Sequence, residues 1–239
     1  MKSIFLYCDE GVCPSSVRET ARSLREYLDP GKYKIELAKR GLFLEDGWEN
    51  RAAMVIFPGG RDIAYLQALQ GAANRRIREY VLCGGRYFGI CAGAYYGSGS
   101  ISFEPGGSLE VIGERELSFF PGCAYGPALG LGQFSPKNSQ GARFTSLALS
   151  SSNFPIINAN AYYHGGCTFL QATSFPGVRI LAEYKELQGN SPAIVLCNAG
   201  NGKALLSGIH PEYQEPDCSD EKANQKKLLF SWLIEILLK

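Results

Sequence analysis

The chain has 239 residues, of which 45% are hydrophobic and 20% are charged, and its formal net charge is +1. This composition is typical of a soluble globular protein with a sizeable core. The near-neutral charge gives no support for nucleic acid or an anionic membrane as a partner. The N-terminal apolar run is cut off at Asp9 and Glu10, too early for a signal-peptide core, so a cytoplasmic protein is expected.

The eight cysteines follow no recognisable metal or redox motif. No Cys-x-x-Cys pair occurs, and His164 and His210 are the only histidines, so a structural zinc site is poorly supported. A chain of this length does not need disulfides as staples, and reduced thiols are therefore expected. Neither a metal nor a cofactor is predicted.

The first ninety residues alternate between strand and helix patterns. Buried strands are expected at 3–8, 33–38, 52–60 and 86–90, the third being ended by its Pro-Gly-Gly. A capping box at 16–19 predicts the start of one helix, and Gly84-Gly85 predicts the end of another. This alternation indicates a parallel sheet covered on both faces. Loops 9–14, 58–62 and 91–97 should converge at its carboxyl edge, where ligands bind in such sheets.

Residues 98–200 are richer in glycine, serine, proline and aromatic residues, with short candidate strands. They predict an antiparallel β-rich extension packed on the sheet, with a hairpin turn at 200–202. The final segment predicts a helix, too short and too charged to span a bilayer. Its apolar face is expected to hold Leu229, Trp232, Leu233, Ile236 and Leu237.

A strand followed by Gly-x-Cys-x-Gly and a helix is the pattern of a nucleophile elbow, and "GICAG" at 89–93 fits it. A sharp turn needs small neighbours, and a helix N-terminus favours a thiolate, so Cys91 is the candidate nucleophile. The alternative is a buried structural cysteine at a strand end.

A nucleophilic thiol needs a base and a group that orients the base. His210 ends the apolar stretch "KALLSGI" and is followed by Pro211 and Glu212, so imidazole and carboxylate can reach one pocket. His164 lies in a glycine-rich aromatic loop and is expected to line the pocket. The backbone N–H groups of Gly60 and Ala92 are the candidates for an oxyanion hole.

The stretches "PGGRD", "IREYVLCGGRYFGICAGAYYGS", "FFPG", "YGP" and "YYHGGCTF", with the His-Pro-Glu, resemble the class I glutamine amidotransferase-like superfamily. Within it, they resemble the N-terminal domain of eukaryotic-type biotin–protein ligases and its free-standing bacterial relatives. The resemblance implies one domain over residues 1–239 with an α/β, flavodoxin-like three-layer fold. It also implies Cys91 as nucleophile, His210 as base and Glu212 as its partner.

Two departures from that resemblance bear on substrate. Glutamine amidotransferases carry glutamine four residues after the cysteine, whereas this chain has Tyr95, which predicts negligible glutaminase activity if the side chain reaches the pocket. If Tyr95 points into the core instead, glutamine could be held by other groups. The adenylate-binding motif of biotin ligases is absent, so biotin ligation is not expected.

The leading hypothesis is a cysteine-dependent amidase or hydrolase that acts on a small amide or acyl compound. Substrate contacts are assigned to the following residues: Gly59, Arg61, Tyr95, Tyr163 and His164. A ligand-binding or regulatory module without turnover is the alternative, in which Tyr95, Tyr96, Tyr162 and Tyr163 line a pocket. A redox-sensing Cys91 is a third hypothesis. The oligomeric state is left open.

Overall fold

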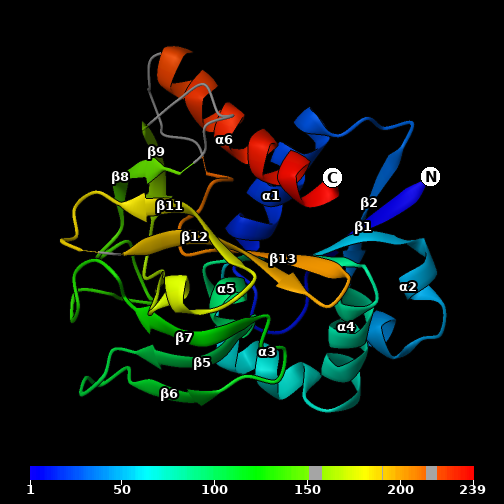
Figure 1. Cartoon of the computed structure of the whole chain (residues 1–239), viewed down its shortest axis with the longest axis horizontal. Helices are drawn as coiled ribbons and strands as arrows, with labels where there is room; N and C mark the ends of the chain where they lie inside the picture. Colours follow the sequence, from blue (N-terminus) through cyan, green and yellow to red (C-terminus); the bar gives the residue numbers. More distant parts are fainter. Residues whose placement is uncertain (151–157, 190, 214–219) are drawn as a thin grey trace.

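A nine-stranded sheet forms the centre of the computed structural model, which describes residues 1–150, 158–189, 191–213 and 220–239 (Figure 1). One half of the sheet is parallel, in the order β2 (Tyr33–Ala38), β1 (Lys2–Tyr7), β3 (Ala52–Phe57), β4 (Arg86–Ile90) and β13 (Gly202–Ser207). The alternating elements of the first ninety residues are therefore confirmed as a parallel α/β unit.

The other half of the sheet is antiparallel. It continues from β13 through β12 (Pro192–Ala199), β11 (Val178–Tyr184), β8 (Arg143–Leu149) and β9 (Asn158–Tyr163). The predicted hairpin joins β12 to β13, and Gly200 takes a positive φ of 58° in its turn. Because this hairpin places β12 beside the parallel half, these strands extend the central sheet, whereas the sequence predicted that they pack on it.

A second sheet accounts for the rest of the β-rich region. It has four strands, in the order β10 (Thr168–Phe169), β7 (Phe120–Gly126), β5 (Ser98–Phe103) and β6 (Val111–Glu114). Figure 1 shows β5, β6 and β7 below the central sheet, close to α3 (Asp62–Leu69).

Helices cover both faces of the central sheet, as expected. On one face lie α1 (Pro14–Tyr27) and α6 (Asp220–Leu238), which pack on Ile4 and Leu6. On the other face lie α3, α4 (Ala72–Leu82) and α5 (Ala92–Tyr96), on the side of Phe5 and Tyr7. Neighbouring residues of β1 thus point to opposite, equally buried layers. Shorter helical turns lie at Arg40–Leu44, Trp48–Arg51 and Ala172–Ser174. Within the described residues, no helix is long and apolar enough to cross a bilayer.

Two details of the helices differ from the sequence predictions. Helix α1 begins at Pro14, so Ser16 is not an N-cap and the predicted capping box is wrong. In α6, Phe230 and Ile234 are buried, while Trp232 and Ile236 are only partly buried. The apolar face is rotated because α6 also packs on α1, where the rings of Phe230 and Tyr27 lie 6.0 Å apart.

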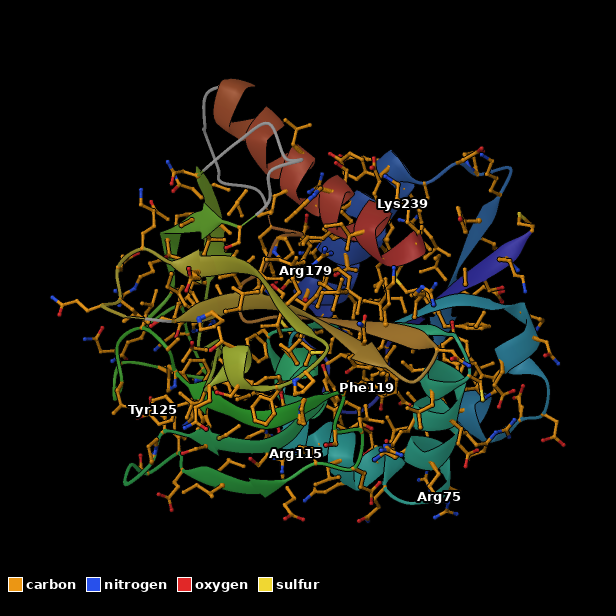
Figure 2. All side chains as sticks on the ribbon, viewed as in Figure 1. Arg75, Arg115, Phe119, Tyr125, Arg179 and Lys239 are labelled. Atoms are coloured by element: carbon orange, nitrogen blue, oxygen red, sulfur yellow. The ribbon has the colours of Figure 1, made fainter. Side chains whose placement is uncertain are left out.

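A buried ion pair ties the second sheet to the first helix after β3. Arg115, which is labelled in Figure 2, follows β6. Its side chain is only 2% exposed. Its Nε and Nη2 donate to one carboxylate oxygen of Asp62 at 2.8 and 2.7 Å. Asp62 is the first residue of α3 and is separated from the Pro-Gly-Gly by Arg61 alone.

Candidate active site

Cys91 sits on a strained turn between β4 and α5. Its φ is 50° and its ψ is −103°, a conformation that costs energy for a residue with a side chain. Gly89 and Gly93 permit the turn because a Cβ on either would lie within 2.3 Å of a backbone oxygen, that of Gly93 or of Phe57 respectively. The predicted elbow is therefore present. Helix α5 spans only five residues, however, so its dipole adds little to the stabilisation of a thiolate.

His210 and Glu212 follow the carboxyl end of β13 and form a buried pair. The Nδ1 atom of His210 lies 2.8 Å from a carboxylate oxygen of Glu212, and the two residues are 6% and 1% exposed. This bond occupies one ring nitrogen and leaves Nε2 for another partner. The Cys91 side chain lies close enough to the His210 ring to raise its pKa. The Cys91 thiol also donates to the His164 carbonyl at 3.6 Å.

The charges around His210 determine its protonation. Burial alone would lower the pKa of His210, but the Glu212 carboxylate and a negative charge on Cys91 raise it well above its usual value. An imidazolium is therefore favoured at neutral pH and is lost as pH rises through that elevated pKa. A cation beside the sulfur stabilises the negative charge that a nucleophilic thiol must carry.

Ser16 is a member of the site that the sequence analysis missed. Its hydroxyl donates to the same Glu212 oxygen at 2.8 Å and accepts from the Gly59 N–H at 2.9 Å. One buried side chain thereby joins the orienting carboxylate to the loop after β3. The sequence can predict that Ser16 lies on a helix, but it cannot predict a hydrogen bond to Glu212, which lies far away in the chain.

The two candidate oxyanion donors lie at the ends of neighbouring strands. Gly60 is held in a β-bridge with Val12, and Arg61 donates its N–H to the Gly11 carbonyl at 2.8 Å. Ala92 is the first residue of α5, where backbone N–H groups have no partner inside the helix. Within the described part of the chain, neither the Gly60 N–H nor the Ala92 N–H has an acceptor.

The residues predicted to bind substrate have different places in the structure. Gly59 lies in the site, but its N–H bonds to Ser16 and its carbonyl accepts from Cys13 and Tyr65. A Cβ on Gly59 would lie 2.6 Å from the His210 ring, so we assign this glycine to close packing rather than to substrate binding. Arg61 is exposed at the start of α3.

Tyr95 and Tyr163 are core residues that support the loop over the site. The Tyr95 hydroxyl donates to the Gly165 carbonyl at 3.0 Å, and its ring packs edge-on against Phe103. The Tyr163 hydroxyl accepts from the Leu129 N–H at 2.9 Å. Both hydroxyls have partners within the protein, where Tyr95 donates to Gly165 and Tyr163 donates to Gly166, and both therefore support the 164–166 loop. Direct contact of either residue with a substrate stays a prediction. The alternative core placement of Tyr95 is the one observed.

His164 lies in that loop with its ring turned to another neighbour. Its Nε2 is 3.2 Å from the Gln140 carbonyl oxygen, and its ring is 4.9 Å from that of Phe134. Burial lowers the pKa of His164. It is the backbone carbonyl of His164, and not its imidazole, that lies near the Cys91 sulfur.

Four partly buried residues lie around His210 or in contact with one another beside it, and of these only Tyr162 was named in advance, as a pocket-lining residue of the binding-module hypothesis. The rings of Tyr162 and Tyr213 lie 5.8 and 5.2 Å from the imidazole. The Tyr213 hydroxyl is 2.6 Å from that of Ser15, which in turn is 3.1 Å from the Cys13 sulfur. Cys13 was within the 9–14 loop that was expected to converge here, and its N–H donates to the Gly59 carbonyl.

Cys13 is a second thiol with an altered environment. Burial would raise the pKa of the Cys13 thiol, but the Ser15 hydroxyl and the backbone N–H groups of Ser15 and Ser16 lower it below its usual value. The charge on His210 acts in the same direction. Any test of cysteine reactivity must therefore distinguish Cys13 from Cys91.

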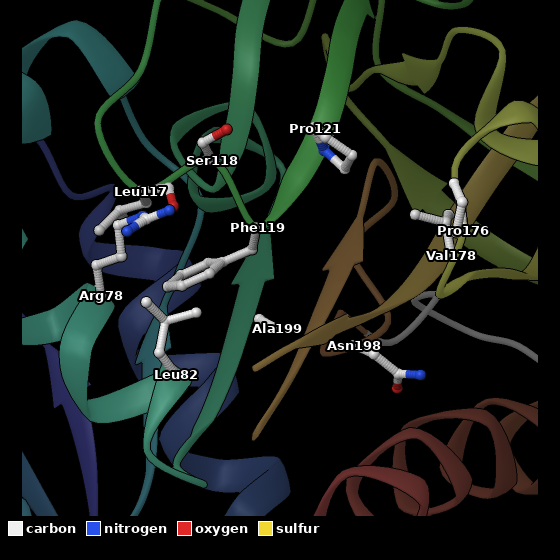
Figure 3. A pocket seen from close by; sticks show the side chains of 10 residues that line it. All are labelled: Arg78, Leu82, Leu117, Ser118, Phe119, Pro121, Pro176, Val178, Asn198 and Ala199. Carbon is white, nitrogen blue, oxygen red and sulfur yellow. The ribbon is translucent and has the colours of Figure 1, made fainter. Parts of the chain in front are cut away.

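A separate cavity lies away from these residues (Figure 3). It has a volume of about 190 Å³ and lies where β12 ends and β13 begins, whereas His210 follows the other end of β13. None of the triad candidates lines it. The lining residues are Arg78, Leu82, Leu117, Ser118, Phe119, Pro121, Pro176, Val178, Asn198 and Ala199.

Solved structures share this fold. A crystal structure of a glutamine amidotransferase superimposes with a TM-score of 0.65 and 17% identity over 98% of each chain. PurLQS from Thermotoga maritima gives a TM-score of 0.59 at 14% identity, over 98% of this chain and 99% of that one. At such identities the likeness concerns the flavodoxin-type fold.

Sequence relatives are more specific. A protein of Chlamydia muridarum (strain MoPn / Nigg), described as uncharacterized, is 40% identical over 94% of this chain and 85% of its own length. The biotin–protein ligase of Schizosaccharomyces pombe (strain 972 / ATCC 24843) is 30% identical over 98% of this chain, which spans only 38% of that enzyme. The model of the family "Biotin-protein ligase, N terminal" matches residues 2–236. The chain therefore belongs to the biotin–protein ligase N-terminal family, on a glutamine amidotransferase-like fold.

Proposed function

We propose that this protein is a cysteine-dependent hydrolase of a small amide or acyl compound, with Cys91, His210 and Glu212 as its triad. The observation that carries the proposal is the strained Cys91 beside an imidazole whose other nitrogen is bonded to a buried carboxylate. Strain of this kind persists only where the surrounding structure enforces it, and it gathers at functional sites.

The proposed reaction has two stages. The Cys91 sulfur attacks the carbonyl carbon, and the negative charge on the carbonyl oxygen is taken up by the Gly60 and Ala92 N–H groups. His210 then gives its proton to the departing nitrogen or oxygen as the bond to carbon breaks, which leaves a thioester on Cys91. In the second stage His210 accepts a proton from water, water attacks the thioester, and the acid leaves with Cys91 free.

A second candidate is a binding or regulatory module that keeps this geometry without turnover. Cys91 and His210 are only 7% and 6% exposed. A substrate has little access to such buried side chains, which favours the binding module. The biotin–protein ligase activity of the Schizosaccharomyces pombe relative is not proposed, because this chain covers little more than a third of that enzyme.

Site-resolved alkylation with iodoacetamide tests the activated thiol. At pH 7 an ordinary thiol is only a few per cent ionised, so Cys91 in the wild-type protein should react about tenfold faster than in His210→Ala. Glu212→Gln should also slow the reaction, because Glu212 is the main group that raises the pKa of His210. The difference between wild type and His210→Ala should shrink above the ordinary thiol pKa of about 8.5.

The alkylated sites are identified by peptide mass spectrometry, since Cys13 is expected to react as well. Equal rates at Cys91 in the wild type and His210→Ala would contradict the activated nucleophile. A panel of amides and esters, glutamine included, then separates the two candidates, with Cys91→Ser as the control. Product formation that needs Cys91 supports the hydrolase, and tight binding without product supports the binding module.

A further inference from the structure

Two tyrosines form an aromatic wall beside the proposed base. The ring centroids of Tyr162 and Tyr213 are 5.0 Å apart, with their planes tilted by 37°. Both rings lie within 6 Å of the imidazole of His210. Both are partly accessible, whereas Cys91, His210 and Glu212 are buried. Tyr162 and Tyr213 are therefore accessible side chains that a molecule can contact as it approaches the imidazole of His210.

The wall is held in place before any ligand arrives. The His210 N–H donates to the Tyr162 carbonyl at 2.8 Å, which fixes the end of β9 against the His210 loop. Tyr213 is fixed from the other side through its hydroxyl contact with Ser15 on α1. Rings that are already ordered lose little conformational freedom when a ligand binds.

The Tyr162 hydroxyl adds a polar group to the wall. Burial raises the pKa of Tyr162, and negative charge on Cys13 and Cys91 raises it further, so the hydroxyl stays protonated at neutral pH. Among the described residues it has no hydrogen-bond partner. It can therefore donate to a substrate without breaking a bond inside the protein.

We infer that Tyr162 and Tyr213 form a substrate subsite that takes a planar aromatic group attached to the reacting amide or acyl carbon or to its nitrogen. The inference rests on the proposed function for the identity of the reacting atoms. Its chemistry is ring-on-ring packing beside His210, for which a saturated ring of the same size is a poor substitute.

Two alkylating agents of matched size test the subsite at Cys91. N-phenyl iodoacetamide and N-cyclohexyl iodoacetamide differ mainly in the planarity and π-system of their rings, and their rates with glutathione give the intrinsic ratio. In the wild-type protein the phenyl-to-cyclohexyl ratio at Cys91 should exceed that of glutathione by about three- to tenfold, the range of an aromatic pair. Tyr162→Leu and Tyr213→Leu should bring the ratio down to the glutathione value.

Tyr33→Leu is the matched control, because Tyr33 lies on β2 at the opposite edge of the central sheet from β9, and the ratio should not change. Tyr162→Phe should keep the ratio, since it keeps the ring. A wild-type ratio equal to that of glutathione, or one that survives both leucine variants, would overturn the subsite.

A binding measurement covers the case in which Cys91 is unreactive towards both reagents. Benzamide should bind Cys91→Ser more tightly than cyclohexanecarboxamide does in calorimetry, and the preference should vanish when Tyr162→Leu is added. Equal affinity for the two amides would reject the subsite. Failure of the proposed function has a different signature, namely Cys91 alkylation that does not depend on His210, whatever the ratio of the two reagents.

Discussion

At the scale of single residues, one serine hydroxyl connects the parts of the candidate site. Ser16 bonds to Glu212, which holds His210, and to Gly59, which packs against the same imidazole. Ser16 therefore fixes the carboxylate and the loop after β3 relative to each other. A hydrogen bond between a hydroxyl and a carboxylate belongs to the stronger kind.

We predict that Ser16→Ala lowers the free energy of unfolding by about 1–3 kcal/mol, because it leaves a buried carboxylate oxygen and a buried N–H with one partner fewer. Urea denaturation measures this change. The variant should also alkylate Cys91 more slowly at neutral pH, towards the rate of His210→Ala, since Glu212 is less firmly placed.

Ser23→Ala is the comparison for this prediction. The Ser23 hydroxyl is also buried and also donates to Glu212, but to its backbone carbonyl at 3.3 Å and not to its carboxylate. Ser23→Ala should lower the free energy of unfolding and leave the reactivity of Cys91 unchanged. If both variants slow Cys91 equally, Ser16 has no special link to the carboxylate.

Tyr162 and Tyr163 show what the sequence could and could not supply at this scale. Alternation along a strand predicts that one of two adjacent tyrosines faces the site and the other faces away. Nothing local to "AYYHGG" says which, because the answer depends on the register between β8 and β9 and on the bridge from Tyr162 to His210. The triad candidates could be proposed from local sequence alone, because they lie just after the carboxyl ends of strands that the sequence predicts.

At the scale of elements, the turn after β4 is a unit in which three backbones lie in contact. Helix α5 packs so closely on β3 that a Cβ on Gly93 would lie 2.0 Å from the Phe57 carbonyl oxygen. The Tyr87 hydroxyl donates to the Gly93 carbonyl at 2.8 Å from within the same layer. This packing holds Cys91 in its positive-φ conformation.

Gly93→Ala is therefore expected to destabilise the protein by at least about 1–3 kcal/mol, the usual cost of overpacking a core. It should also remove the rapid alkylation of Cys91, because relief of the clash moves α5. Thermal or urea unfolding and site-resolved alkylation measure the two effects.

Gly41→Ala provides the reference for that substitution. Gly41 is exposed, and a Cβ there would meet nothing within 4 Å. A change within about 0.5 kcal/mol is expected for such a surface site. Should Gly93→Ala be equally mild and leave Cys91 reactive, close packing is not what shapes the turn.

The strands of the first ninety residues could be predicted because each is a short apolar run bounded by turn residues, and α1 and α4 because they are amphipathic. Helix α3 was not predicted, because its apolar residues show no helical periodicity. The later strands could not be placed so well. Short strand-like segments occur throughout residues 98–200, yet β8, β9, β11 and β12 join the central sheet whereas β5, β6, β7 and β10 form a separate one. The choice depends on pairing between distant segments, which local patterns do not encode.

At the scale of the whole molecule, the Asp62–Arg115 pair joins the second sheet to helix α3, next to the candidate oxyanion loop. Both side chains are largely removed from solvent, so each charge depends on the other for its partner. The pair is structural in our interpretation, and it sets the position of α3 relative to β6.

Arg115→Met should lower the free energy of unfolding by about 3–5 kcal/mol, because it strands the Asp62 carboxylate in the interior. The double variant Asp62→Asn with Arg115→Met removes the stranded charge and should recover part of that loss. Urea denaturation measures whether the double variant has a higher free energy of unfolding than Arg115→Met. If the single and double variants are equally stable, an unpaired Asp62 carboxylate carries no energetic penalty, and the interpretation is wrong.

The pairing of β4 with β13 has a consequence for how the protein folds. Phe88 and Leu205 are register partners in the parallel sheet, and Ser16 bonds to Glu212 from near the other end of the chain. Contacts so distant in sequence require closure of long loops and slow the folding of a domain. The candidate site should therefore be assembled only when the two halves of the chain have joined, so that enhanced Cys91 reactivity during refolding marks completion of the native state and not an early compact intermediate.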